Sequence, residues 1–136
     1  MKVVQTIADI RAEVRALKAA GKKVAFVPTM GALHGGHLSL IHLAQKKADA
    51  IVVSIYVNPA QFAPTDDFDT YPKTIESDLK LCEQEGVSLV FMPDTEIMYG
   101  SGKKYFSIEI EELNKHLDGG SRHGYFQGIS LVVNKL

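Results

Sequence analysis

Two histidines three residues apart stand in a glycine-containing segment near the start of the chain. His34 and His37 lie within Pro28-Thr-Met-Gly-Ala-Leu-His-Gly-Gly-His37, which leads into an apolar, helix-like run. Residues three apart lie on the same side of a helical turn, so both imidazoles can reach one ligand. A helix N-terminus also offers unpaired N–H groups and a partial positive charge, which suit a phosphate. The pattern therefore predicts a phosphate site, with the helix end binding the anion and the imidazoles donating to developing charge.

Each of these features also has a plainer interpretation. A glycine-rich turn after a strand is often only a turn, and a single histidine is more often structural than catalytic. A His-x-x-His metal pair is a weaker alternative, because no third ligand stands at a suggestive spacing, and we predict no metal-binding residues. The segment matches neither the G-x-G-x-x-G dinucleotide fingerprint nor the P-loop pattern.

The elements around this segment alternate as a parallel α/β sheet requires. Apolar spacing predicts helices over residues 6–20, 37–48 and 74–85. Apolar runs predict buried strands over residues 23–27, 50–57 and 87–92, the first of them stopped by Pro28. In the third helix, Ile75, Leu79 and Cys82 are expected to face the core. Further on, the sequence predicts a strand, a short helix and a turn over residues 105–110, 111–117 and 119–120. We expect a Rossmann-like, doubly wound parallel sheet of the α/β class.

Composition narrows the class of protein. The 136 residues are 46% hydrophobic and 23% charged, which is ordinary for one globular domain. Fifteen basic against sixteen acidic side chains argue against a nucleic-acid or anionic-membrane partner. The single cysteine, Cys82, excludes an intrachain disulfide and fits a reducing compartment. No apolar run approaches the ~20 residues of a membrane span, and the first residues do not resemble a secretion signal. We therefore expect a cytoplasmic protein.

Four segments, in this order along the chain, resemble one enzyme family. They are Val27-Pro-Thr-Met-Gly-Ala-Leu-His-Gly-Gly-His-Leu-Ser-Leu-Ile41, Val53-Ser-Ile-Tyr-Val-Asn-Pro-Ala-Gln-Phe62, Tyr71-Pro-Lys-Thr74 and Ser121-Arg-His-Gly-Tyr-Phe-Gln-Gly-Ile129. H-x-G-H at the start of the helix after the first predicted strand is typical of adenylate-transferring nucleotidyltransferases. The flanking residues closely resemble the pantothenate synthetases (pantoate–β-alanine ligases).

This resemblance implies a two-step reaction that joins two small molecules. Pantoate attacks ATP with the assistance of Mg²⁺ and gives pantoyl adenylate, from which β-alanine then displaces AMP. His37 would donate a proton or hydrogen bond to the phosphates, with His34 beside it, and Gln61 would bind pantoate and help to place β-alanine. The resemblance also implies a homodimer. The ATP-binding residues would be Met30, Gly31, Ala32, Leu33, His34, Gly35, Gly36 and His37.

The residues themselves give partial support to the role of Gln61. It follows directly from a predicted strand, so it faces the same sheet edge as the histidine segment. An amide can both donate and accept, which suits a hydroxy acid. A solvated loop glutamine is the plainer alternative.

The chain also departs from the family pattern. Gly35 stands where an acidic residue is usual, and Tyr125 stands where histidine is common. Family members are considerably longer, with Gly-x-Lys-Asp and Ser-Ser-Arg segments and a smaller closing domain. We therefore expect residues 1–136 to be an N-terminal ATP- and pantoate-binding domain that is incomplete, without the C-terminal lid domain and with impaired turnover. Two alternatives stay open: an H-x-G-H adenylyltransferase acting on phosphopantetheine or a nicotinate nucleotide, and a non-catalytic nucleotide-binding or assembly module.

Overall fold

The chain divides into two compact units. One unit comprises Met1–Val57 with Pro72–Asp94, and the other comprises Asn58–Tyr71 with Thr95–Leu136. The computed structural model describes residues 1–62, 74–100, 107–108, 110–112, 115–116, 118–122 and 124–136. Across those ranges, each helix is too short or too polar to cross a lipid bilayer.

The first unit is built on a four-stranded, all-parallel sheet. Its strands are β1 (Lys2–Val4), β2 (Val24–Thr29), β3 (Ala50–Ile55) and β4 (Leu89–Phe91), in the order β1-β4-β3-β2. Every residue of β3 is buried, as expected of a central parallel strand covered on both faces. The predicted parallel α/β architecture is confirmed.

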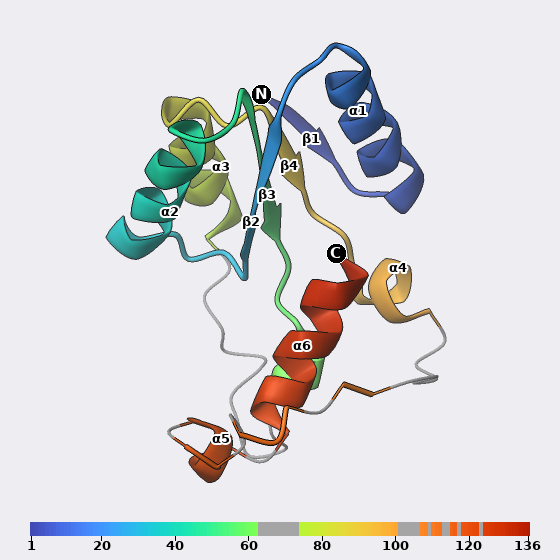
Figure 1. The fold of residues 1–136 in the computed structure, drawn as a ribbon, viewed down its shortest axis with the longest axis vertical. Coiled ribbons are helices and arrows are strands. Elements are labelled where there is room, and N and C mark those ends of the chain that lie inside the picture. Colours follow the sequence, from blue (N-terminus) through green and yellow to red (C-terminus); the bar gives the residue numbers. More distant parts are fainter. Residues whose placement is uncertain (63–73, 101–106, 109, 113–114, 117, 123) are drawn as a thin grey trace. The chain divides into compact units, whose positions relative to one another are not determined.

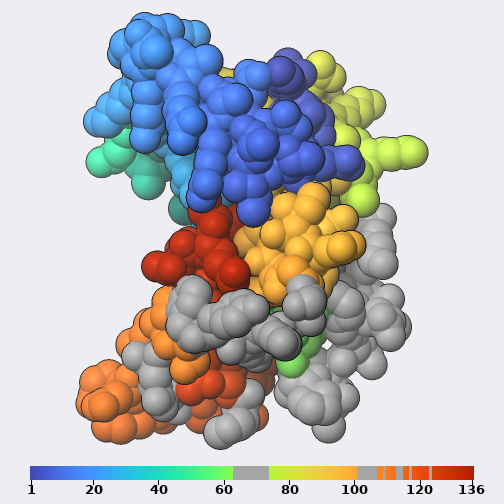
Figure 2. Space-filling view, turned by 90° about the vertical axis from the view of Figure 1, so that its right-hand side faces the viewer, coloured from blue at the N-terminus to red at the C-terminus, as the bar shows by residue number. Residues whose placement is uncertain are grey.

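Three helices cover the two faces of this sheet. They are α1 (Ile7–Ala19), α2 (Gly35–Gln45) and α3 (Ile75–Gln84). The chain crosses from β1 to the far edge at β2 and then returns through β3 to β4. Because parallel crossovers are right-handed, this reversal puts α1 on one face and α2 and α3 on the other (Figure 1). Figure 2 shows α1 as the blue surface beside the N-terminal strand, and none of its residues is fully buried.

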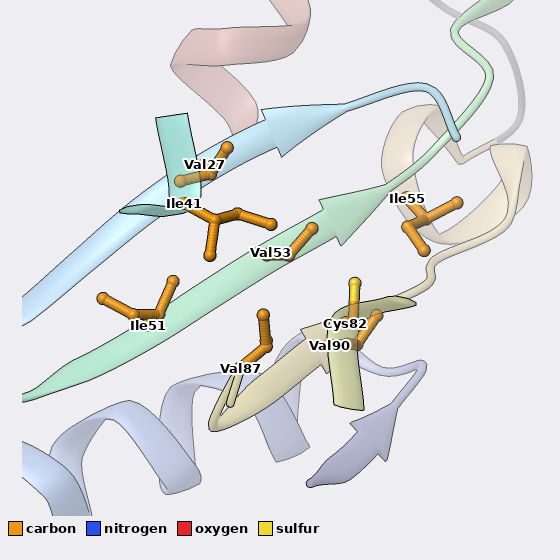
Figure 3. Packing of buried hydrophobic residues seen from close by; sticks show 8 residues of the cluster. All are labelled: Val27, Ile41, Ile51, Val53, Ile55, Cys82, Val87 and Val90. Carbon is orange, nitrogen blue, oxygen red and sulfur yellow. The ribbon is translucent and has the colours of Figure 1, made fainter. Parts of the chain in front are cut away.

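The core lies between the sheet and the helices α2 and α3. Ile41 of α2 and Cys82 of α3 are both fully buried against Val53 and Val90 of the two inner strands. Burying one such aliphatic side chain contributes about 1.5–3 kcal/mol. This core fixes α2 and α3 on the sheet. The eight buried residues drawn in Figure 3 are Val27, Ile41, Ile51, Val53, Ile55, Cys82, Val87 and Val90.

The structure corrects the prediction at two of the strands. The sequence did not predict β1, which has only three residues and pairs with β4. The predicted stop at Pro28 is wrong, because β2 continues through Thr29 and Pro28 stands opposite Ser54. Proline is tolerated there because β2 is an edge strand, where a missing N–H costs no ladder hydrogen bond.

Helix boundaries follow the prediction more closely. The Thr6 hydroxyl caps α1 by accepting the Asp9 N–H at 3.1 Å. Helix α2 begins at Gly35, two residues before the predicted start. Ile75 does not face the core: as the first residue of α3 it is 43% exposed, and Asp78 takes the inward position one turn later.

The described residues of the second unit are mainly helical. This unit contains the 3-10 turn η1 (Pro59–Gln61) and the helices α4 (Thr95–Tyr99), α5 (Asp118–Ser121) and α6 (Tyr125–Lys135). Gly128 of α6 lies directly against η1, since a Cβ there would be 2.3 Å from the Ala60 carbonyl oxygen. The predicted turn at residues 119–120 lies inside α5. Of the strand and helix predicted over residues 105–110 and 111–117, the structure describes 107–108, 110–112 and 115–116, and none of these residues lies in a strand or α-helix; the other positions lie outside the described residues.

Candidate anion site at the start of helix α2

The loop between β2 and α2 makes a tight turn just before the histidines in the chain. Gly31 has φ +83°, and a Cβ on it would lie 3.0 Å from Asp78 Oδ2 and 3.2 Å from Ile55 Cγ2, so only glycine fits. The next residue, Ala32, also has a positive φ of 49°, which is uncommon for a residue with a side chain. The Gly31 N–H is bonded to Thr29 Oγ1 at 3.2 Å, and that hydroxyl donates to the Ser54 carbonyl at 2.7 Å.

A buried carboxylate from α3 holds this turn. Asp78 Oδ2 accepts the Ala32 N–H at 2.9 Å, and Asp78 Oδ1 accepts the Leu33 N–H at 2.8 Å. The Thr74 hydroxyl donates to Oδ2 at 3.1 Å, and Asp78 is only 2% exposed. The N–H groups of the turn therefore point inward, toward the protein.

The two histidines cap the first turn of α2 reciprocally. His34 is the N-cap, and its Nδ1 accepts the Gly36 N–H at 3.1 Å. His37 Nδ1 accepts the His34 N–H at 3.3 Å. The two ring centroids are 4.1 Å apart, so the rings lie side by side, as their spacing predicted. A Cβ on Gly36 would lie 2.9 Å from His34 Cε1, whereas a Cβ on Gly35 would meet nothing within 4 Å. The capping geometry of the histidines therefore does not depend on which residue stands at position 35.

These hydrogen bonds determine where each imidazole carries its proton. A nitrogen that accepts a hydrogen bond holds no proton, so both rings are neutral with the proton on Nε2. Burial lowers the pKa of His37 below its ordinary value of 6.5, and the neighbouring His34 lowers it further. The Asp78 carboxylate opposes both effects by raising this pKa. His37 therefore acts as a neutral Nε2–H donor near pH 7.

Part of the helix end stays available to a ligand. The prediction of unpaired N–H groups needs one correction, because the Gly36 N–H is taken by His34. The His37 N–H, at the third helical position, is also turned toward the His34 side chain in the capping box, whereas within residues 1–62 and 74–100 the Gly35 N–H has no acceptor. Two imidazole donors and the Gly35 N–H thus lie at one helix N-terminus, where the helix dipole also favours an anion.

Gln61 lies in the second unit, in a buried polar network. It is 7% exposed, so the alternative of a solvated loop glutamine is wrong. Its Oε1 accepts from Asn58 Nδ2 at 3.1 Å, and that amide also donates to the Gly128 carbonyl at 3.1 Å. Asn58 Oδ1 accepts the Ala60 N–H and the Tyr99 hydroxyl. Among the described residues, the Gln61 amide nitrogen has no acceptor and can donate to a ligand.

The sequence prediction missed Asp78. Its signal was nevertheless present, because Asp78 stands next to Leu79 and four residues before Cys82, on the face predicted to be buried. A carboxylate on a core face needs donors, and those donors are the loop N–H groups. In the part of the chain that the structure describes, no three His, Cys, Asp or Glu side chains are grouped as metal ligands.

The fold and this geometry define a parallel α/β domain with a candidate anion site at the carboxyl edge of its sheet, where ligands of open parallel sheets bind. A model of the Pantoate-beta-alanine ligase family matches residues 2–136. The chain is 48% identical over its whole length to the pantothenate synthetases of Acidobacterium capsulatum and Koribacter versatilis. The chain belongs to the pantoate–β-alanine ligase family.

Solved structures agree with this assignment. Pantoate-beta-alanine ligase from Francisella tularensis, described as complexed with beta-gamma ATP and beta-alanine, is 38% identical with a TM-score of 0.90 over 99% of this chain. Pantothenate synthetase from Thermus thermophilus is 39% identical with a TM-score of 0.85, also over 99% of this chain. The match covers 51% and 47% of those two chains. The chain likewise spans about half the length of the curated relatives, at 49% and 46% of the two above.

Proposed function

We propose that this chain binds ATP and pantoate and forms the pantoyl adenylate from which pantothenate is made. A carboxylate oxygen of pantoate attacks the α-phosphorus of ATP, and the bond from that phosphorus to pyrophosphate breaks. The amine of β-alanine then attacks the acyl carbon, and AMP leaves as the amide forms. The observation that carries this proposal is the pair of neutral Nε2–H donors at the start of α2, in a chain that the family model matches over residues 2–136.

In this proposal the residues 30–37 bind the phosphates of ATP. His37 and His34 donate from Nε2 to phosphate oxygens, and the free N–H group of Gly35 binds the same anion. Donors aimed at developing charge stabilise the transition state more than the bound substrate. Because positioning and electrostatics suffice for adenylation, the reaction needs no protein nucleophile.

The remaining participants are assigned by chemistry and by likeness to relatives. We assign Gln61 to pantoate and then to β-alanine, since its free amide nitrogen can donate to either acid. The Francisella tularensis complex with an ATP analogue and β-alanine supports both ligands for this family. Mg²⁺ would enter with ATP, because Mg²⁺ at nucleotide sites is held largely by phosphates and water. A homodimer and a cytoplasmic location are part of the same proposal.

Exchange of labelled pyrophosphate into ATP tests the first step. The account predicts exchange that requires pantoate and does not occur with phosphopantetheine or nicotinate mononucleotide. Exchange supported by one of those acceptors instead would favour another H-x-G-H adenylyltransferase. Calorimetric binding of ATP without any exchange would favour a non-catalytic nucleotide-binding module.

A further inference from the structure

We propose that Asp78 is a positioning residue for the anion site, because its carboxylate holds the loop that presents His34 and His37. The inference rests on the ATP-binding role proposed above for that loop. It adds a residue from α3 that lies 45 and 46 positions along the chain from its two loop partners.

Three donors meet the Asp78 carboxylate, and both of its oxygens only accept. The Ala32 and Leu33 N–H groups bind one oxygen each, at 2.9 and 2.8 Å, and the Thr74 hydroxyl binds Oδ2 at 3.1 Å. Acceptance at both oxygens is what the ionised carboxylate offers. Hydrogen bonds to a charged group are the strong ones, so these contacts hold the turn firmly.

No ion pair balances this buried charge. Among the described residues, neither lysine nor arginine lies within ion-pair distance of Asp78. The charge is stabilised by the N-terminus of α3, in whose first turn Asp78 stands, and by the loop N–H groups. Since a buried carboxylate without donors is costly, the side chain and the turn stabilise each other.

The two loop bonds also set the direction of the donors above them. They fix the peptide units on either side of Ala32, the residue with φ +49°. Leu33 directly precedes His34, the N-cap of α2, so the orientation of Leu33 determines how the chain enters the helix. With the loop N–H groups turned toward Asp78, the donors left for the anion are the two imidazoles and the Gly35 N–H. Asp78 thus selects which donors face the ligand.

Asp78→Asn in the 136-residue chain tests this role. The asparagine side chain has the same size as the aspartate side chain. However, its NH₂ group replaces one of the two carboxylate oxygens, so one loop N–H group faces a donor and loses its acceptor. Glu76→Gln is the matched control, because it removes the same charge from an exposed position in the same turn of α3. We expect ATP affinity, measured by calorimetry, to fall about tenfold or more in Asp78→Asn and to stay unchanged in Glu76→Gln.

Two nucleotide-free signals separate positioning from general structural support. The amide protons of Ala32 and Leu33 should resonate downfield in the unchanged chain and shift upfield in Asp78→Asn. The His37 titration should move to lower pH, because Asp78 raises the pKa of that imidazole. Both signals can be measured in a chain that binds no ATP. A failure to bind ATP would therefore contradict the proposed function and leave the positioning role to be decided by these two signals.

A folded Asp78→Asn chain with unchanged amide signals, His37 titration and ATP affinity would overturn the proposal. If that variant does not fold, Thr74→Val takes its place, since Thr74 is exposed and makes no side-chain cap bond. Removing the Thr74 hydroxyl should shift the Ala32 amide signal and weaken ATP binding by a smaller factor. An unchanged Ala32 signal and affinity in Thr74→Val would equally overturn it.

Discussion

At the scale of single residues, the two histidines bind the backbone with one nitrogen and leave the other free. Each Nδ1 accepts a backbone N–H of the same turn, so each Nε2 carries the proton and faces away from those contacts. The rings are therefore fixed in tautomer before a ligand arrives. A donor that is already oriented loses little conformational entropy on binding, which makes its hydrogen bond to phosphate more effective.

Replacing His37 with alanine should weaken ATP binding while preserving the fold. The change removes one hydrogen bond to a charged group, which corresponds to about a tenfold loss of affinity or more, and adenylation should fall by about 10²–10³. Calorimetry with ATP measures the first effect, and the pantoate-dependent exchange assay measures the second. His42→Ala is the control, because His42 lies on the same helix and contacts Glu85 instead. Equal losses in both variants would refute the assigned role.

The titration of His37 tests the tautomer directly. Because the folded chain lowers the pKa of His37 below 6.5, this group contributes stability above that pH and loses it as the pH falls toward the folded pKa. Protonation also places a proton on Nδ1, which can then no longer accept the His34 N–H. Nitrogen-15 NMR should show the Nε2–H form at pH 7 and a midpoint below that of the urea-unfolded chain. A midpoint at or above the unfolded one, or an Nδ1–H form, would contradict the account.

At the scale of elements, close backbone contacts decide where glycine is required. Gly128 lets α6 lie against η1, where a side chain would meet the backbone of Ala60. Gly35 at the start of α2 has open space around it. The same residue type is therefore structural in one helix and replaceable in the other.

Gly128→Ala should destabilise the chain, because backbone atoms cannot yield as the tip of a side chain can. Overpacking of this kind costs about 1–3 kcal/mol, and denaturant unfolding measures it. Gly35→Ala is the matched control, and its free energy of unfolding should stay the same or rise, since alanine favours a helix. If Gly128→Ala is as stable as the unchanged chain, α6 does not lie as close to η1 as described.

The sequence was sufficient to predict the elements that position the anion site. Apolar periodicity located α1, α2 and α3, and β-branched runs located the inner strands. The sequence was insufficient where contacts between elements determine the structure. Strand β1 is too short to show a pattern, and Pro28 is tolerated within β2 only because that strand lies at an edge of the sheet. Asp78 was missed for the same reason, because its donors come from a loop that is remote in sequence.

At the scale of the whole molecule, the predicted site residues divide between the two units. The histidine loop and Asp78 belong to the first unit, whereas Gln61 and its Asn58 network belong to the second. Each unit holds its own residues through local hydrogen bonds. The family resemblance, rather than spacing, is what joined Gln61 to the same reaction, since an isolated amide carries little signal by itself.

Cys82 offers a probe of the folded chain. Burial, and then the nearby Asp78 charge, raise the pKa of this fully buried thiol to about 11 from an ordinary value of 9.0. The reactive thiolate at pH 8 is therefore about a hundredfold scarcer than in the unfolded chain, and access is blocked as well. A chromogenic disulfide reagent should react far more slowly with the native chain than with the urea-unfolded one. Equal rates would show that Cys82 is not buried between α3 and the sheet as described.

Titration of the nitrogen-15-labelled chain with ATP tests the central claim most directly, that the phosphates of ATP bind at the start of α2. The account predicts saturable shifts that are largest at the Gly35 amide and at Nε2 of both histidines. The Ala32 and Leu33 amides, held by Asp78, should change little. No saturable shift at the start of α2, or largest shifts elsewhere in the chain, would contradict the claim.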